Sequence, residues 1–376
     1  MPCAWFTRFV EFFIKLGFWA TISDSSLFVP HRGTNTAYLL LYVHDIVLTG
    51  SNSALLREIV DRLRAEFAVR DMGALSFFLG IDVKRTRDGF YLNQDRYAED
   101  ILEHAGMMSY KPIATPIDAK GKLNVDGLAV DDAHSYHSLA DALQYLTMTQ
   151  PDIAFAVQQV CLHMHDPRMP HLALLKRILP YIRSTTSHGL LLRASTDFSV
   201  TAYSDADWGG FPDTRRSTSG FCVYLGDSLV SWSSKRQPTV SRSSAEAEYR
   251  AVANVAAECI WLRQLLGELR CDIKKATVVF YDNVSAVYMS TNPVHHKRTK
   301  HIELDTHFVR ERVQLGELRV LHVPTGEQFA DVMTKGLPTA SFERFRSGLC
   351  VEPLEHSTTG VNLLYSVAHP SDCGGC

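Results

Sequence analysis

Long uncharged hydrophobic runs are absent from this chain of 376 residues. Its aromatic-rich stretch at residues 5–18 is interrupted by Arg8, Glu11 and Lys15, so it is too short and too charged to span a bilayer. The stretch also lacks the basic start and the small-residue cleavage site of a signal peptide. We therefore predict no membrane partner and no secretion, and we expect this segment to form a core helix.

A strong excess of either charge is also missing. The formal net charge is -3 at pH 7, so overall charge does not by itself point to a nucleic-acid partner. The eight cysteines are scattered, which argues against a disulfide framework. Cys373 and Cys376 end a polar tail without a second pair, and we assign them no metal or redox role. What remains is an ordinary globular composition, with length for about two or three domains.

Two carboxylates stand at the end of a predicted strand that begins at Thr201. Asp205 and Asp207 lie two residues apart and so share one face of the strand, just before Gly209 and Gly210. Like charges this close repel each other and need a cation or another compensating group. Taken alone, the pattern fits an Asp-rich turn equally well.

The predicted helix at residues 243–269 gives two glutamates different roles. Its apolar side chains recur at alternating three- and four-residue steps, which defines one buried stripe, and Glu248 lies on that stripe. A charge there is costly without a partner. Glu246 points away from the stripe and follows Ser243 at the spacing of a capping box. We therefore expect Glu246 to cap the helix and Glu248 to belong to a site.

Two further acids follow predicted strands. Asp282 comes directly after one apolar strand, and Asp331 lies in a predicted helix that begins near Thr325, after another strand. With Asp205 and Glu248 they form a set of four oxygen ligands that suits Mg²⁺ or Mn²⁺. Two such ions about 4 Å apart can activate water and stabilise the leaving oxygen in phosphodiester hydrolysis.

The segment from Tyr203 to Lys335 resembles the RNase H domain of copia-type LTR retrotransposons. The motifs that carry the resemblance are Ser-Asp-Ala-Asp-Trp-Gly from Ser204, Arg-Arg-Ser-Thr-Ser-Gly from Arg215, Ser-Ala-Glu-Ala-Glu-Tyr from Ser244, Tyr-Asp-Asn from Tyr281, Lys300-His301 with His307, and Ala-Asp-Val-Met-Thr-Lys from Ala330. The resemblance implies that Asp205, Glu248, Asp282 and Asp331 are catalytic and bind two Mg²⁺ or Mn²⁺ ions.

The N-terminal part resembles the reverse transcriptase of the same family. Residues 37–50 form two apolar runs around His44 and Asp45, where the family normally has Tyr-Val-Asp-Asp, and we expect a hairpin with its turn at this pair. A neutral imidazole in place of the first Asp is a poor Mg²⁺ ligand. The family's other palm Asp lies upstream of the matched residues. Asp45 would then belong to a vestigial metal site, and polymerase activity is expected to be lost unless a partner chain completes it.

The expected fold is α/β and α+β in series over several domains. The segments are a partial reverse-transcriptase palm at 1–92, a helical thumb or connection at 93–196 with a linker near 118–134, an RNase H domain at 197–350 with a mixed five-stranded sheet and flanking helices, and a disordered tail at 351–376.

Two features of the predicted connection have competing interpretations. Pro180 lies inside a helical pattern, where a proline costs about 3 kcal/mol, so the helix is either bent or decayed. His163, His165 and His171 suggest a metal site, but the segment is helical and few further ligands are near. We favour solvated histidines.

Basic residues gather in two runs, and the resemblance makes them candidates for contacts to the phosphates of an RNA/DNA hybrid. The candidates are Lys235, Arg236, Arg242, Lys297, Arg298, Lys300, His301 and His307. His301 and His307 could equally face solvent on a basic helix, and His322 is a weaker candidate for moving a proton. For Asp207 we prefer a turn cap to a second-metal ligand. For Trp208 and Trp232 we expect packing.

The leading prediction is therefore metal-dependent hydrolysis of the RNA strand of RNA/DNA hybrids by a fragment of a retrotransposon reverse transcriptase/RNase H. Other retroelement Pol or Gag products are possible partners, in a cytoplasmic virus-like particle or in the nucleus. The alternative is an inactive retroelement remnant that at most binds nucleic acid.

Overall fold

The computed structural model describes residues 2–30, 35–43, 45–119, 126–271, 273–283, 302–354 and 364–368. The chain divides into two compact units. The first comprises Met1–Arg87, Trp261–Asp272 and Ser357–Cys376, and the second comprises Asp88–Ile260 and Ile273–His356. The segment predicted as connection falls within the second unit, and so does the segment predicted as RNase H domain, except for Trp261–Asp272.

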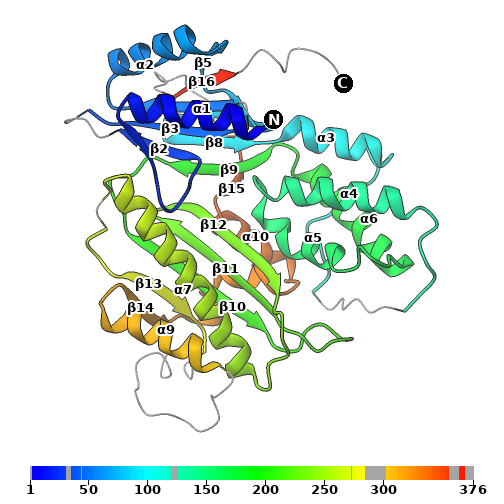
Figure 1. Ribbon diagram of the computed structural model, residues 1–376. Helices are drawn as coiled ribbons and strands as arrows, with labels where there is room; N and C mark the ends of the chain where they lie inside the picture. Colours follow the sequence, from blue (N-terminus) through cyan, green and yellow to red (C-terminus); the bar gives the residue numbers. More distant parts are fainter. Residues whose placement is uncertain are drawn as a thin grey trace. The chain divides into compact units, whose positions relative to one another are not determined.

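The first unit is an antiparallel sheet packed against helices through an aromatic core (Figure 1). The strand order is β1 (Phe18–Ala20), β2 (Leu27–Pro30), β3 (Ala37–Tyr42), β4 (Asp45–Gly50), β16 (Leu364–Ala368) and β5 (Arg70–Ala74). A short antiparallel pair follows, β6 (Phe77–Phe78) and β7 (Ile81–Arg85). The helices are α1 (Pro2–Lys15) and α2 (Ser53–Glu66). Phe9 and Phe13 of α1 are fully buried, which confirms the predicted N-terminal core helix.

The hairpin of β3 and β4 turns one residue earlier than predicted. Tyr42 pairs with Asp45, so Asp45 is the first residue of β4 and not part of the turn, in which Val43 lies. Val43 has a φ of 51°, in the left-handed region that two-residue hairpin turns require and that a β-branched residue adopts with strain. His44 lies outside the described residues.

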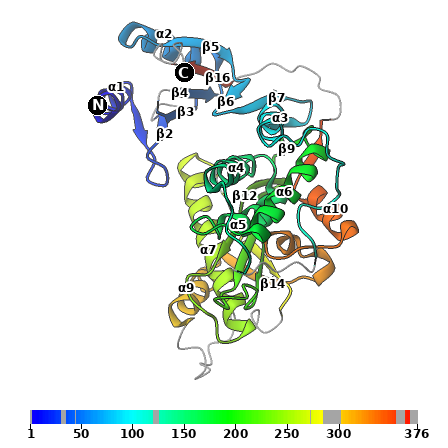
Figure 2. The same ribbon diagram turned by 90° about the vertical axis from the view of Figure 1, so that its right-hand side faces the viewer.

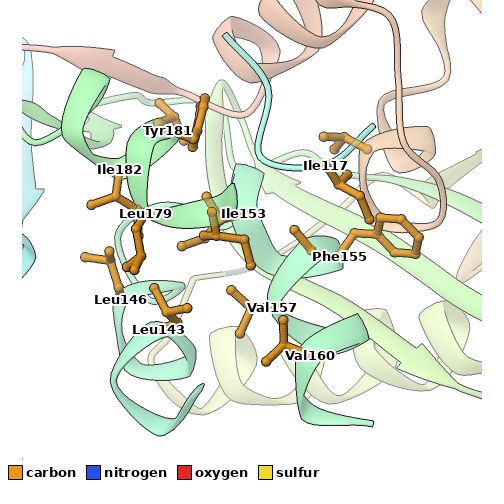
Figure 3. Close-up of a cluster of buried hydrophobic side chains, with 14 of the residues drawn as sticks. Ile117, Leu143, Leu146, Ile153, Phe155, Val157, Val160, Leu179, Tyr181 and Ile182 are labelled. Atoms are coloured by element: carbon orange, nitrogen blue, oxygen red, sulfur yellow. The ribbon is translucent and has the colours of Figure 1, made fainter. Parts of the chain in front are cut away.

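The second unit begins with a cluster of helices. They are α3 (Asp95–His104), α4 (Ala133–Leu146), the 3₁₀ helix η1 (Pro151–Ile153), α5 (Ala154–Cys161) and α6 (Met169–Ser184). Their apolar side chains pack together in Figure 3, and the same core continues to Cys222 and Tyr224 of the sheet described next. Pro180 is buried within α6, which continues past it to Ser184, so the helix has not decayed.

A mixed five-stranded sheet forms the centre of this unit (Figure 1). Its order is β12 (Ser228–Arg236), β11 (Thr218–Leu225), β10 (Val200–Asp207), β13 (Thr277–Tyr281) and β14 (Leu318–His322). The first three strands are antiparallel, whereas β13 runs parallel to β10 and to β14. This sheet is the predicted RNase H-like sheet, and its flanking helices are α7 (Ser244–Glu268), α9 (Glu303–Gln314) and α10 (Thr339–Gly348).

Alternation along β10 sends its side chains to two different layers. Ala206 packs on Ala247 and Ala251 of α7, whereas Tyr203 packs in the core that contains Phe342 and Phe345 of α10. In the side view of Figure 2, α7 and α10 accordingly lie on opposite sides of the sheet. The small alanine side chains bring α7 close to the strand that carries Asp205.

The prediction of a disordered C-terminal tail is wrong for two segments. Residues Val351–Pro353 form β15, which pairs with β9 (His188–Arg193), and β9 pairs in turn with β8 (Gly89–Asn93). Leu364–Ala368 form β16 between β4 and β5. These strands gain their backbone hydrogen bonds from partners far away in the sequence, which a local pattern does not reveal. No helix in the described part of the chain is both long and apolar enough to cross a membrane.

Candidate metal and catalytic site

Three carboxylates meet at the carboxyl ends of β10 and β13. Tyr203 pairs with Phe280 in the parallel ladder, so Asp205 and Asp282, each two residues further on, come level with each other. Asp331 reaches the same place from the 3₁₀ helix η4 (Phe329–Met333). One carboxylate oxygen from each of the three lies within 4.8 Å of the others. Elsewhere among the described residues, no three Asp, Glu, His or Cys side chains converge in this way.

A glycine in β11 makes room for the segment that carries Asp331. Gly220 pairs with Asp205, and a Cβ atom added to it would lie 2.5 Å from the Cβ of Met333. Gln328 then fixes the segment to β10. Its buried amide donates a hydrogen bond to the Ser204 carbonyl at 3.1 Å, and its Oε1 accepts one from the Ala330 amide at 3.2 Å.

The predicted helix around Asp331 is wrong in type. The structure has two short 3₁₀ helices, η3 (Thr325–Glu327) and η4. Gln328 between the two helices takes φ −82° and ψ 90°, an extended conformation that interrupts a helix, and its side chain bonds to β10. Asp331 is 4% exposed and still reaches the cluster.

Hydroxyl and ammonium groups surround the carboxylates. Thr334 donates a hydrogen bond to Asp205 Oδ2, and Thr325 donates one to Asp282 Oδ2 at 3.4 Å. Lys335 Nζ lies 2.8 Å from Asp331 Oδ1 and 3.5 Å from Asp205 Oδ2.

Burial and mutual repulsion make ionisation of the cluster costly. Burial, and next the charge of Asp205, raises the pKa of Asp331 and also that of Asp282, while Lys335 partly offsets both effects. The negative charge of the three carboxylates thus exceeds the positive charge of Lys335. A divalent cation binds favourably under this condition.

Glu248 lies beside this cluster but is not one of its three members. It is partly buried on α7, and the amide of Asn283 donates a hydrogen bond to its Oε2. Burial, followed by the charges of Asp282 and Asp205, raises the pKa of Glu248 to about 7, although Asn283 lowers it in part. This carboxyl can therefore be protonated or ionised near neutral pH.

Glu246 caps α7 as predicted. Ser243 Oγ accepts from the Glu246 amide at 3.2 Å, and Glu246 Oε2 accepts from the Arg242 amide at 2.9 Å. Glu246 is also buried, with 8% of its surface exposed. Its ion pair with Arg250, at 2.8 Å, explains how this second carboxylate is buried without joining the cluster.

Comparison with known proteins assigns the chain to a family. Residues 1–119 match the family model described as reverse transcriptase (RNA-dependent DNA polymerase). The Retrovirus-related Pol polyprotein from transposon RE1 of Arabidopsis thaliana is 44% identical over 351 residues, 93% of this chain and 24% of that polyprotein. An uncharacterized mitochondrial protein of the same plant is 48% identical over 224 residues, 60% of this chain and 93% of that protein. The chain belongs to the copia-type retrotransposon Pol family.

The chain spans about a quarter of the length of the Pol polyproteins that it matches, 24% in the case of transposon RE1. Among solved structures, an RNase H1 in complex with an RNA/DNA hybrid aligns with a TM-score of 0.29 and 14% identity. That alignment covers 36% of this chain and 94% of the other.

The motif that begins at Ser204 also contains Asp207 and Trp208, whose side chains lie in different surroundings. A Cβ atom added to Gly210 would lie 1.5 Å from Asp207 Oδ2, so this carboxylate folds over the turn, in line with the preferred cap. Trp208 is 52% exposed, and its Nε1 donates to the Ser241 carbonyl at 3.0 Å. The expected packing is therefore wrong for Trp208, whereas Trp232 does pack against the core.

Only some of the basic residues predicted to contact nucleic acid lie within the described part of the chain. Lys235 and Arg242 are exposed, and the guanidinium of Arg236 lies 4.9 Å from the ring centre of Phe211. His307 is exposed on α9, with its Nε2 4.0 Å from Glu303 Oε1. The remaining candidates, Lys297, Arg298, Lys300 and His301, lie outside the described residues.

Asp45 and the three histidines considered as metal ligands are not members of the cluster. Asp45 is partly buried at the start of β4 and is not among the three converging acids. The expectation of solvated histidines is wrong for His163 and His171, which are buried with their rings stacked at 3.5 Å, whereas His165 is exposed. Burial, and next His171, lowers the pKa of His163 to about 4.

Three residues that contact the carboxylates of the site have no role predicted from the sequence. Thr334, Lys335 and Asn283 lie within motifs already noted, but their contacts depend on how distant segments meet. One signal was available: an isolated glycine inside a strand, such as Gly220, indicates close approach of another backbone.

Proposed function

We propose that this chain hydrolyses the RNA strand of RNA/DNA hybrids with the help of divalent metal ions. The observation that carries the proposal is the convergence of Asp205, Asp282 and Asp331 within 4.8 Å at the edge of an RNase H-like sheet. All three donors are carboxylate oxygens, the ligands that Mg²⁺ and Mn²⁺ prefer. Membership of the copia-type Pol family supports this nucleic-acid chemistry.

The chain's residues divide the work among them. Asp205, Asp282 and Asp331 would hold two Mg²⁺ or Mn²⁺ ions, together with Glu248 beside them. Bound ions of this kind supply positive charge to a phosphodiester and activate water for its hydrolysis.

Glu248 adds a fourth carboxylate to this donor set. Burial and the charges of Asp282 and Asp205 raise its pKa to about 7 in the metal-free chain, and a bound cation would favour its ionised form. Asn283 holds the carboxylate in a defined orientation through its hydrogen bond to Oε2.

The hybrid itself would be held by the exposed groups near the site. Lys235, Arg242 and the partly exposed Arg236 offer positive charge to phosphates, and the exposed His307 offers a ring nitrogen as a hydrogen-bonding group. Trp208 presents an aromatic face that is fixed by its bond to Ser241, and such a face can stack on a base or sugar.

We infer further that the N-terminal unit no longer polymerises DNA. The motif around Asp45 carries His44 where the family has its first metal-binding Asp, and imidazole is a poor ligand for Mg²⁺. We also propose that the chain acts with other Pol or Gag products, in cytoplasmic virus-like particles or in the nucleus.

The test is a cleavage assay with purified protein, Mg²⁺ or Mn²⁺ and a hybrid whose RNA strand is labelled. We expect the wild type to cut the RNA strand, and Asp282→Asn to lose this activity. Asp207→Asn is the matched control, because Asp207 lies on the same strand as Asp205 but folds over the turn. A folded wild type that binds the hybrid without cutting it would favour the inactive remnant instead.

A further inference from the structure

Lys335 contacts two members of the carboxylate cluster at once. Its Nζ lies 2.8 Å from Asp331 Oδ1 and 3.5 Å from Asp205 Oδ2. The backbone positions this contact, because the Lys335 amide donates to the Asp331 carbonyl at 3.1 Å and so continues the turn that follows η4. The two residues are therefore neighbours on one turn, four positions apart in sequence.

We propose that the Lys335 ammonium is a built-in counter-ion that stabilises the carboxylate cluster before metal binds and competes with the incoming ion for the same oxygens. This inference rests on the metal site of the proposed function. It adds a regulatory role for a residue to which that function assigns none.

Three carboxylates crowd together where Lys335 reaches them. Asp205, Asp282 and Asp331 bring carboxylate oxygens within 4.8 Å of one another, and the side chains of Asp205 and Asp331 are 8% and 5% exposed. Like charges so close and so poorly solvated repel strongly, and a cation between them offsets that cost. Lys335 supplies one positive charge at hydrogen-bonding distance from Asp331.

The Lys335 side chain can move away from the carboxylates. The Lys335 side chain is 40% exposed, much more than the two carboxylates that it contacts. A lysine ends in a compact charge on a flexible stem, so its ammonium can move into water while the backbone stays in place. Displacement by a divalent ion therefore requires a change of side-chain rotamers and no unfolding.

The charge state of Lys335 agrees with this role. A lysine side chain ordinarily carries its positive charge throughout the neutral range. A metal ion therefore meets a cation already in contact with Asp331 and Asp205.

A contact to the substrate is the competing role for this lysine. If Lys335 only bound a phosphate of the hybrid, its removal would reduce cleavage but would alter neither the stability of the metal-free protein nor its affinity for metal. Those two quantities therefore distinguish the roles, and neither of them requires catalytic turnover.

The experiment compares the wild type with Lys335→Met, which keeps the length of the side chain and removes its charge. Lys274→Met is the matched control, because Lys274 is an exposed lysine of the same unit. Melting temperature is measured in EDTA, and Mn²⁺ affinity is measured by calorimetry at low ionic strength.

We expect Lys335→Met to melt about 2–4 °C lower than the wild type in EDTA. We also expect it to bind Mn²⁺ roughly tenfold more tightly, because a competing charge at the site has been removed. Lys274→Met should match the wild type in both measurements. An unchanged melting temperature and an unchanged Mn²⁺ affinity in Lys335→Met would overturn the proposal that Lys335 acts as a counter-ion.

A variant that does not fold is also informative. In the double variant Lys335→Met/Asp331→Asn, one carboxylate is removed together with the ammonium, so folding should recover if charge balance is the cause. Failure of the double variant to recover would overturn the inference. Absence of Mn²⁺ binding by the wild type would contradict the proposed function, whereas equal Mn²⁺ affinities of the wild type and Lys335→Met would overturn only the counter-ion.

Discussion

Asp205 and Gly220 lie directly opposite each other on β10 and β11. The carboxylate of the first needs partners from η4, and the missing side chain of the second lets η4 come close enough to provide them. The site therefore depends on a residue that contributes no ligand.

Gly220→Ala should displace η4 from the sheet. The added Cβ would lie 2.5 Å from Met333 Cβ and 2.8 Å from Thr334 Cγ2, and both atoms belong to closely packed residues. Overpacking of this type costs about 1–3 kcal/mol, so we expect a lower free energy of unfolding in urea together with weaker Mn²⁺ binding.

Gly267→Ala is the control for that change. No atom lies within 4 Å of a Cβ built at Gly267, which lies within α7. Alanine in place of a helical glycine stabilises by up to about 1 kcal/mol. If Gly220→Ala is as stable as the wild type and binds Mn²⁺ equally well, close packing of η4 is not what positions Asp331.

Asp282→Asn should raise the stability of the metal-free protein while it abolishes cleavage. Burial and the charge of Asp205 both oppose ionisation of Asp282, so a neutral amide relieves a cost that the carboxylate bears. We expect the melting temperature in EDTA to rise by about 2 °C. A lower melting temperature would mean that the bond from Thr325 matters more than the repulsion.

Glu248→Gln should change how stability depends on pH. The pKa of Glu248 is about 7 in the folded chain, against an ordinary value of 4.5, so the folded state binds more protons between these values than the unfolded state. Its contribution to stability is therefore fully present below pH 4.5 and is lost as the pH rises through 7. The variant should lack this loss in metal-free buffer.

Two histidines act in the opposite direction and make the comparison with Glu248→Gln necessary. Burial lowers the pKa of His163 and of His188 to about 4, so both favour the unfolded state as the pH falls from 6.5 toward 4. Because both proteins contain these histidines, the difference in melting temperature between wild type and variant isolates Glu248. Parallel curves from pH 4.5 to 8 would show that Glu248 titrates normally.

Trp208→Ala should weaken binding of the hybrid without changing affinity for Mn²⁺. Base–aromatic stacking contributes about 1–3 kcal/mol, which corresponds to a loss of affinity between about fivefold and a hundredfold. Fluorescence anisotropy in EDTA measures binding apart from cleavage. Trp208→Phe keeps an aromatic face and should retain most of the affinity. Equal binding by Trp208→Ala and the wild type would leave the exposed ring without this role.

The parts of the site that sequence could predict are those with local signals. Asp205 and Asp282 end apolar strands, and parallel strands bring such ends together. Glu248 was marked by the helical period of α7, and it does lie beside the cluster. The strands β10, β13 and β14 and the helix α7 follow local patterns of the same kind.

The parts that sequence missed depend on contacts between distant segments. A bond from Gln328 to Ser204 helps to give the residues around Asp331 their conformation, and no helical propensity encodes that bond. Likewise β16 forms between two strands of the first unit that lie far earlier in the sequence, as the pairing of Ala368 with both Arg70 and Asp45 shows. Lys335 gains its role only when Asp205 and Asp331 have come together.

The central claim is that carboxylates from β10, β13 and η4 form one divalent-metal centre. Calorimetric titration of Mn²⁺ into the wild type and into Asp205→Asn tests it most directly, with Asp207→Asn as control. We predict saturable binding by the wild type and by Asp207→Asn, and affinity at least roughly tenfold weaker in Asp205→Asn. Equal binding by all three proteins, or no binding by the folded wild type, would contradict the account.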